Sequence, residues 1–187
     1  MSPRPGLNQQ KVVDAAIEIA SHSGMESVTM HALAKKLEVR PPSLYNHIKS
    51  LEDLRQQLAR IAIIDLYNKM EEVAKGKVAV EALTAISKAY IEYAQKQPGL
   101  YEATLIKSGN RNLDVKDTGD KIVHLLKGIL ADYHLNEKDT IHFIRGFRSI
   151  LHGFATLEQK SGFGIPISID ESLDYVIQTY VNGINQD

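Results

Sequence analysis

Apolar residues recur along nearly the whole chain at the three- and four-residue spacing of an α-helix, and long alternating strand patterns are absent. The pattern predicts an all-α protein of nine helices, three short ones at the front of the chain and six behind them. We expect these helices at about 8–22, 30–37, 41–47, 51–75, 80–96, 100–107, 116–133, 137–159 and 169–182.

Local signals support several of these boundaries. Ser50 and Ser168 each stand three residues before an acidic residue, as in a capping box, and Asn136 is placed to cap the helix after it. Gly24 follows the first helix, where glycine is the usual residue beyond a C-terminus. The polar stretch 108–114 is predicted to be a loop, and 161–166 a glycine-rich linker.

Composition narrows the class of protein. Apolar residues make up 43% and charged residues 24% of the 187 residues, which is typical of a folded globular chain. The absence of cysteine excludes disulfides, thiolate metal sites and cysteine nucleophiles, and it fits a reducing compartment. No apolar stretch approaches the roughly 18–20 residues of a membrane helix, and the N-terminus lacks the apolar core of a signal peptide. We therefore expect a cytoplasmic protein with no membrane partner.

The charge distribution is more informative than the net charge of −1. Residues 1–50 carry six basic against four acidic side chains, whereas the remainder carries sixteen against nineteen. A mildly basic front on an acidic body fits nucleic-acid binding by the front, although chance would also explain so small a difference.

The two short helices before residue 50 predict a helix-turn-helix unit, in which the second helix faces the major groove of DNA. Leu44 and Ile48 are expected to face inward and to hold this recognition helix in place. Thr29 is expected to cap the helix before it, where its hydroxyl and the free backbone N–H groups meet a phosphate. The candidate DNA-binding residues are Thr29, Arg40, Pro41, Ser43, Tyr45, Asn46, His47 and Lys49.

The segment TMHALAKKLEVRPPSLYNHI (29–48), followed by LEDL (51–54), strongly resembles the DNA-binding head of tetracycline-repressor-like (TetR) regulators. The resemblance covers about the first 60 residues. Two positions depart from the family pattern: Glu38 stands where the turn usually has glycine, and Leu51 replaces a lysine that often contacts phosphate. Lys49 is a possible substitute for that lysine.

The rear half resembles a subgroup of these regulators whose C-terminal domain bears a Trp-His-Gly signature. The matching segments are RSILHGFATLE (148–158), GFGIP (162–166) and DES (170–172), with Leu151 in place of the tryptophan. The resemblance implies a helical body that binds small ligands and dimerises through its last two helices. The predicted division is a DNA-binding domain over 1–50 and a ligand-binding and dimerisation domain over 51–187.

Aromatic residues of the body are candidates for a ligand pocket, although each is equally at home in an ordinary core. Such surroundings would suit a mostly apolar effector with one or two polar groups. The candidate pocket residues are Tyr67, Tyr90, Tyr93, Tyr101, Leu105, Phe143 and Phe147.

A face of small residues on the eighth helix, together with an apolar stripe on the last, predicts a twofold-symmetric dimer. Packing of the small residues within one protomer is the alternative. The candidate interface residues are Gly146, Ser149, Gly153, Leu173, Val176, Ile177 and Tyr180.

Other functions have weaker support. No two of the seven histidines lie three or four residues apart, so we expect no metal site, and His152 is interpreted as a hydrogen-bonded core residue. The chain lacks the nucleophile and phosphate-binding motifs of common enzymes, and we expect neither catalysis nor a cofactor. The leading hypothesis is a ligand-responsive regulator, most simply a repressor, that binds double-stranded operator DNA as a homodimer. The alternative is a helical adaptor that binds protein rather than specific DNA.

Overall fold

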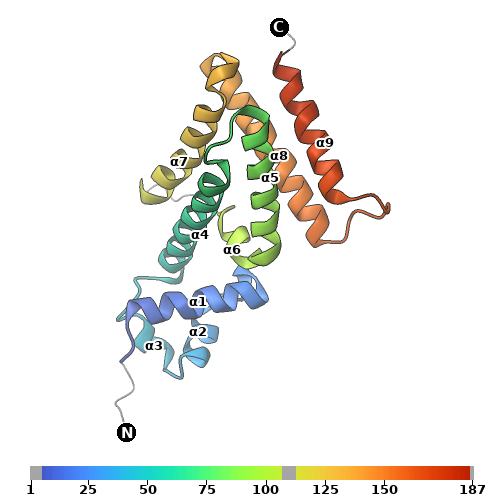
Figure 1. Cartoon of the computed structure of the whole chain (residues 1–187). Helices are drawn as coiled ribbons and strands as arrows, with labels where there is room; N and C mark the ends of the chain where they lie inside the picture. Colours follow the sequence, from blue (N-terminus) through green and yellow to red (C-terminus); the bar gives the residue numbers. More distant parts are fainter. Residues whose placement is uncertain (1–5, 107–112, 186–187) are drawn as a thin grey trace. The chain divides into compact units, whose positions relative to one another are not determined.

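The computed structural model describes residues 6–106 and 113–185, and within them it contains helices and no strand. The predicted loop at 108–114 falls almost entirely outside the described residues. The helices are shown in Figure 1, and their bounds are α1 (Gln9–Ser23), α2 (Met30–Lys36), α3 (Pro41–Leu44), α4 (Leu51–Ala74), α5 (Ala79–Lys96), α6 (Pro98–Ala103), α7 (Leu113–Ile129), α8 (Glu137–Gln159) and α9 (Ile169–Asn182). Short 3₁₀ turns follow α1, α7 and α9, at Met25–Ser27, Ala131–Tyr133 and Gly183–Asn185.

The predicted caps are confirmed. Ser50 Oγ accepts from the Asp53 backbone N–H at 3.0 Å, and Asn136 Oδ1 accepts from Asp139 at 3.0 Å. Ser168 Oγ accepts from Glu171 at 3.3 Å. Three helices end clearly earlier than predicted, and one of them, α6, stops at Ala103 rather than near residue 107. The recognition helix α3 stops at Leu44, and the chain continues as turns through His47. Helix α7 stops at Ile129, and a 3₁₀ turn begins two residues later, at Ala131.

The chain forms two compact units, which we describe separately. The N-terminal unit comprises Met1–Ile64 and Gln97–Asp117, and the C-terminal unit comprises Asp65–Lys96 and Thr118–Asp187. The first part of α4 and all of α6 therefore pack with the predicted DNA-binding domain, so the N-terminal unit is larger than the expected domain of 1–50.

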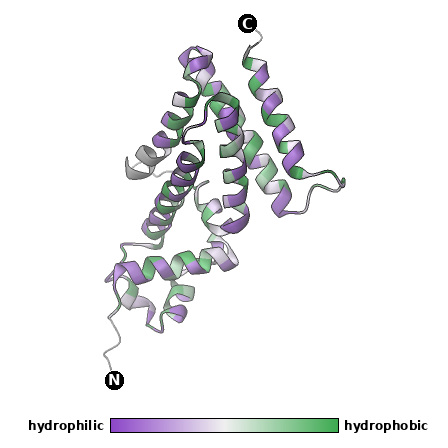
Figure 2. Ribbon diagram, viewed as in Figure 1, coloured by the Kyte–Doolittle hydropathy of each residue, from purple (hydrophilic) through white to green (hydrophobic). Residues whose placement is uncertain are grey.

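The core of the N-terminal unit is built on α1, which packs against α2 and α6. Three residues of the apolar face of α1 are fully buried, namely Val12, Ala16 and Ala20. The side chains of Leu33, Leu44, Leu54 and Leu58 are equally inaccessible to solvent. Figure 2 shows the expected alternation of hydrophobic and hydrophilic residues around these helices. The head therefore has an apolar core of its own.

The C-terminal unit is organised around α5, which packs against both α8 and α9. Phe147, Leu151, Leu173 and Ile177 are the main apolar side chains buried by the two later helices. Polar contacts fasten both helices to α5: Lys88 pairs with Asp174 at 2.8 Å, and Gln159 Nε2 donates to the Ala94 carbonyl at 2.7 Å. No helix in the described part of the chain is both long and apolar enough to span a membrane.

Candidate nucleic-acid interface

Helix α2 begins with the predicted cap. Thr29 Oγ1 accepts from the Ala32 backbone N–H at 3.1 Å, which satisfies one of the free donors of the first turn. Leu33 and Ala34 are buried, and Lys36 pairs with Glu18 of α1 at 2.5 Å. The hydrogen bond and the charge of Lys36 lower the pKa of Glu18. The packing of α2 on α1 thus fixes the helix that precedes the recognition element.

The turn between α2 and α3 places Glu38 in the left-handed region, with φ of 56°. The following N–H group, of Val39, donates to the Ala34 carbonyl at 3.0 Å and closes the end of α2. This is the position at which resemblance to the family led us to expect glycine. The turn therefore forms without glycine, at the conformational cost that a side chain incurs in this region.

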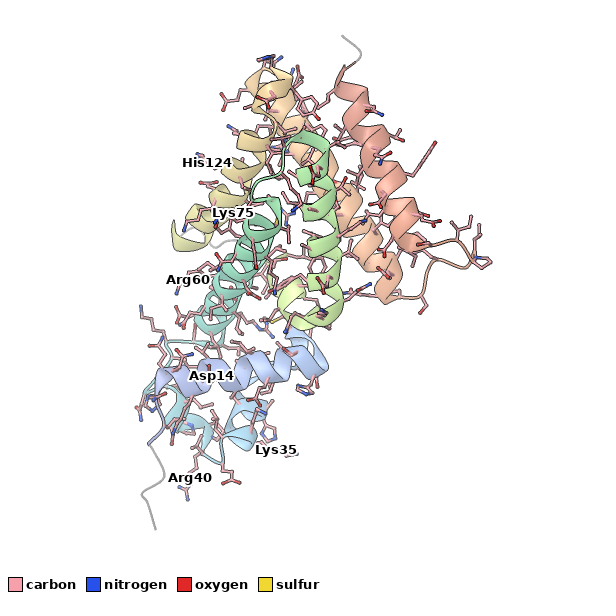
Figure 3. All side chains as sticks on the ribbon, viewed as in Figure 1. Asp14, Lys35, Arg40, Arg60, Lys75 and His124 are labelled. Carbon is pink, nitrogen blue, oxygen red and sulfur yellow. The ribbon has the colours of Figure 1, made fainter. Side chains whose placement is uncertain are left out.

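Residues 40–49, which comprise α3 and the turns after it, present polar side chains above two apolar anchors. Leu44 is fully buried and Ile48 is 4% exposed, which confirms their predicted inward orientation. Tyr45 is 59% exposed, and the Arg40 side chain extends away from the helices (Figure 3). The other predicted DNA-binding residues of this segment are also accessible: Pro41, Asn46 and Lys49 are exposed, and Ser43 and His47 are half-buried.

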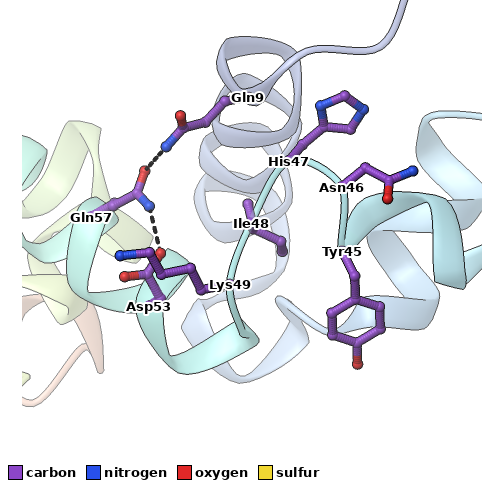
Figure 4. A pocket seen from close by; sticks show the side chains of 8 residues that line it. All are labelled: Gln9, Tyr45, Asn46, His47, Ile48, Lys49, Asp53 and Gln57. Atoms are coloured by element: carbon purple, nitrogen blue, oxygen red, sulfur yellow. Dashed lines mark hydrogen bonds between the residues drawn. The ribbon is translucent and has the colours of Figure 1, made fainter.

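An open pocket of about 460 Å³ lies beside this segment (Figure 4). It is bounded by the start of α1, the turns after α3 and the start of α4. Within it Gln9 Nε2 donates to Gln57 Oε1 at 3.2 Å, and Gln57 Nε2 donates to Asp53 Oδ2 at 2.9 Å. The lining residues are Gln9, Tyr45, Asn46, His47, Ile48, Lys49, Asp53 and Gln57.

The docking of α6 on α1 was not foreseen from the sequence. A Cβ atom at Gly99 would stand 1.9 Å from the carbonyl oxygen of Ala20, so the two backbones touch. Glu102 Oε2 also accepts from the Met25 N–H at 3.0 Å. The only sequence signal at this place was the Pro98-Gly99 pair, which indicates a chain break and gives no partner.

The predicted ligand-pocket residues divide between the two units. Tyr90 and Tyr93 of α5 and Phe143 and Phe147 of α8 are buried in the C-terminal unit, on helices that pack together. Burial, together with the Asp65 carboxylate, raises the pKa of Tyr93, so its hydroxyl stays protonated near neutral pH. Burial of these four aromatic side chains fits an ordinary core as well as a pocket wall, so their role in ligand binding stays a prediction.

The other three members have different surroundings. Tyr67 is only partly buried and donates to Glu71, with the Lys121 ammonium 5.9 Å from its ring centre. Tyr101 is buried in the N-terminal unit, and Leu105 is 42% exposed there. Tyr67 therefore lies near the surface among charged neighbours, and its role in a ligand pocket stays a prediction.

Several predicted interface residues pack inside the protomer, as in the alternative to the dimer. Tyr180 donates to the Phe143 carbonyl at 3.0 Å, and a Cβ at Gly146 would stand 2.0 Å from the Tyr180 hydroxyl oxygen. Gly146 therefore accommodates Tyr180 of its own chain. Leu173 and Ile177 are 1% and 0% exposed in the single protomer, so they are already covered.

The remaining predicted interface residues stay available. Ser149 is exposed, Val176 is half-buried, and a Cβ at Gly153 would meet no atom within 4 Å. Tyr175, which lies outside the predicted interface set, is 73% exposed on α9. Within the described residues no group of three or more His, Asp or Glu side chains is arranged to hold a metal ion.

Both parts of the chain match family models. Residues 12–58 match the bacterial regulatory proteins of the tetR family, and residues 83–180 match the tetracyclin repressor-like C-terminal domain. The uncharacterized HTH-type transcriptional regulator YobS of Bacillus subtilis is 40% identical over 185 residues, covering 98% of this chain and 96% of that protein. The narrower Trp-His-Gly subgroup stays a prediction.

Solved structures share the fold. A protein of unknown function from Rhodococcus sp. RHA1 superposes with a TM-score of 0.82 at 18% identity, over 100% of both chains. The regulator FadR of Bacillus subtilis, in complex with stearoyl-CoA, superposes with a TM-score of 0.70 at 18% identity, over 93% of this chain and 98% of that one. On the family models and the full-length similarity to YobS, the chain belongs to the TetR family of DNA-binding transcriptional regulators.

Proposed function

We propose that this regulator is a homodimeric repressor that binds a double-stranded operator through residues 40–49 and leaves it when a mostly apolar effector binds the body. The observation that carries the proposal is the division of this segment into buried anchors and exposed polar groups. Leu44 and Ile48 hold it in place, while Tyr45 and Asn46 are exposed to solvent. Side chains that contribute little to packing are free to contact base edges.

The proposed contacts fall into two groups. The donors and acceptors for base edges come from Arg40, Ser43, Tyr45 and Asn46. Pro41 packs against the same bases. Thr29, His47 and Lys49 lie at the ends of the short helices and contact phosphates, which position the head without reading sequence. A dimer would place two such heads about one helical turn of DNA apart, or a multiple of it, so we expect a palindromic operator.

The effector part of the proposal rests on the aromatic residues of the C-terminal unit. Tyr90, Tyr93, Phe143 and Phe147 supply apolar surface with two hydroxyl groups, which suits a ligand with a large apolar part. FadR of Bacillus subtilis was solved with stearoyl-CoA, a ligand of that kind. An effector releases the operator only by as much as its affinity differs between the two states, typically about 1–3 kcal/mol.

Fluorescence anisotropy with DNA from upstream of the regulator's own gene tests the proposal. We expect salt-dependent binding that unlabelled specific DNA displaces at a concentration at which scrambled DNA does not. Asn46→Ala should lower affinity for the operator by about 1–3 kcal/mol and affect scrambled DNA little, whereas Lys49→Ala should weaken both. Lys75→Ala, which removes an exposed charge from the C-terminal unit, is the matched control. Equal displacement by specific and scrambled DNA would exclude a sequence-specific repressor and favour the adaptor alternative.

A further inference from the structure

A chain of hydrogen bonds connects the first turn of α1 with the first turns of α4 (Figure 4). Gln57 stands at its centre, since its amide oxygen accepts from Gln9 and its amide nitrogen donates to Asp53. Gln57 and Asp53 are both half-buried, so water competes less for these groups than at an open surface. These two hydrogen bonds therefore fix the position of the Asp53 carboxylate beside residues 40–49, the segment proposed to bind DNA.

Lys49 lines the same pocket as Asp53, and Figure 4 shows its side chain reaching toward that residue. Nevertheless, Lys49 forms no ion pair within the described residues, and it is exposed. Asp53 is the only carboxylate among the eight residues of this pocket. A lysine and an aspartate that line one pocket attract each other, but at an exposed site this attraction is weak, so a single competing contact can decide whether they pair.

Gln57 supplies the competing contact. An exposed lysine–aspartate pair gains little free energy, because water solvates both charges and two flexible side chains must be ordered. A hydrogen bond from an amide to a carboxylate is of comparable strength. An amide donor that fixes the orientation of the Asp53 carboxylate can therefore decide whether Lys49 pairs with it.

We infer that Gln57 is a positioning residue of the DNA interface: it holds Asp53 away from Lys49, which leaves the Lys49 ammonium available to a DNA phosphate. Gln57 itself does not touch the DNA. The inference rests on the proposed function, because it assumes that Lys49 contacts a phosphate. Gln9 holds the other end of the Gln57 amide and so fixes which way the nitrogen points.

Replacement of Gln57 by methionine, which has nearly the same length and no donor, tests the inference. We expect Gln57→Met to weaken DNA binding about fivefold, because the freed Asp53 pairs with Lys49. The slope of log affinity against log salt should fall by about one for each protomer, since one phosphate contact is lost. Gln57→Glu should act in the same direction and more strongly, because it repels Asp53 and itself attracts Lys49.

Two variants, Asp53→Asn and Lys49→Ala, serve as backgrounds that distinguish a positioning role of Gln57 from an effect on stability alone. In Asp53→Asn, no carboxylate remains to capture Lys49, so adding Gln57→Met should leave affinity and salt slope unchanged. In Lys49→Ala, the same addition should also have no effect. Equal weakening by Gln57→Met in the wild type and in both backgrounds would show a purely structural role and overturn the inference.

The two proposals fail in different ways. If Lys49→Ala leaves affinity and salt slope unchanged, Lys49 does not contact phosphate, and both this part of the interface and the inference are wrong. If Lys49→Ala weakens binding but Gln57→Met does not, the interface stands and only the role of Gln57 is overturned. The melting temperature of each variant is measured before the titrations, and this identifies any variant that does not fold. If Gln57→Met unfolds the head, Gln57→Glu carries the same comparison.

Discussion

A Cβ atom at position 99 would stand 1.9 Å from the carbonyl oxygen of Ala20, so α6 meets the last turns of α1 backbone to backbone. Gly99→Ala should therefore force the two helices apart and destabilise the N-terminal unit by about 1–3 kcal/mol. Chemical denaturation, followed by circular dichroism, measures this change in the free energy of unfolding.

Gly128 of α7 provides the matched control, because it is also helical but a Cβ there would meet no atom within 4 Å. Gly128→Ala should stabilise the protein by about 0.5–1 kcal/mol, as expected from helix propensity alone. Equal effects of the two substitutions would contradict the close contact at Gly99.

Glu102 should stabilise the 3₁₀ turn that leads from α1 to α2, since its carboxylate accepts from the Met25 N–H. Glu102→Ala leaves this part-buried donor without its partner, and we expect a loss of about 1–3 kcal/mol. Hydrogen exchange of the Met25 amide should accelerate accordingly. Glu102→Gln keeps an acceptor oxygen at the same place and should lose less, and an unchanged exchange rate in Glu102→Ala would argue against the bond.

Glu38 should be replaceable by glycine with a gain in stability, because its φ of 56° disfavours a side chain. We expect Glu38→Gly to stabilise the head by about 1 kcal/mol, after the greater freedom of glycine in the unfolded chain is allowed for. DNA binding should also tighten, because a negative charge leaves an exposed turn beside the recognition helix.

Glu38→Ala separates the two effects, since it removes the charge and keeps a Cβ. It should tighten DNA binding like the glycine variant, yet gain none of its thermal stability. If both variants melt at the same temperature, the left-handed conformation carries no cost at this position.

Gly146 and Gly153 should respond differently although they are seven residues apart on the same helix. Gly146→Ala displaces the Tyr180 ring and its hydrogen bond to Phe143, so it should lower protomer stability by about 1–3 kcal/mol. A Cβ at position 153 would meet no atom of the same protomer within 4 Å, so Gly153→Leu should leave protomer stability nearly unchanged. We expect it to weaken dimerisation instead, which sedimentation measures. A Gly153→Leu protein that remains fully dimeric would remove Gly153 from the interface.

Much of the fold could be predicted from the sequence because its determinants are local. Caps such as Ser50, Asn136 and Ser168 bond to backbone groups three residues away, so sequence spacing alone identifies them. The inward orientation of Leu44 and Ile48 also follows from helical periodicity within one short segment.

What was missed depends on contacts between residues distant in sequence. A stripe of small residues indicates that something packs closely, but it does not tell whether the partner is Tyr180 of the same chain or a second subunit. The bond from Met25 to Glu102 spans 77 positions, and no periodicity encodes such a pair. The chain Gln9–Gln57–Asp53 was missed for the same reason.

The separation of anchors from exposed groups in residues 40–49 has an evolutionary consequence. Leu44 and Ile48 hold the segment, and Tyr45 and Asn46 bury little surface, so substitutions at these two exposed positions should scarcely alter folding. After a gene duplication, the spare copy could acquire a new operator preference through substitutions at these exposed positions without losing its fold. The same property makes the head suitable for selection from a randomised library, in which most members would still fold.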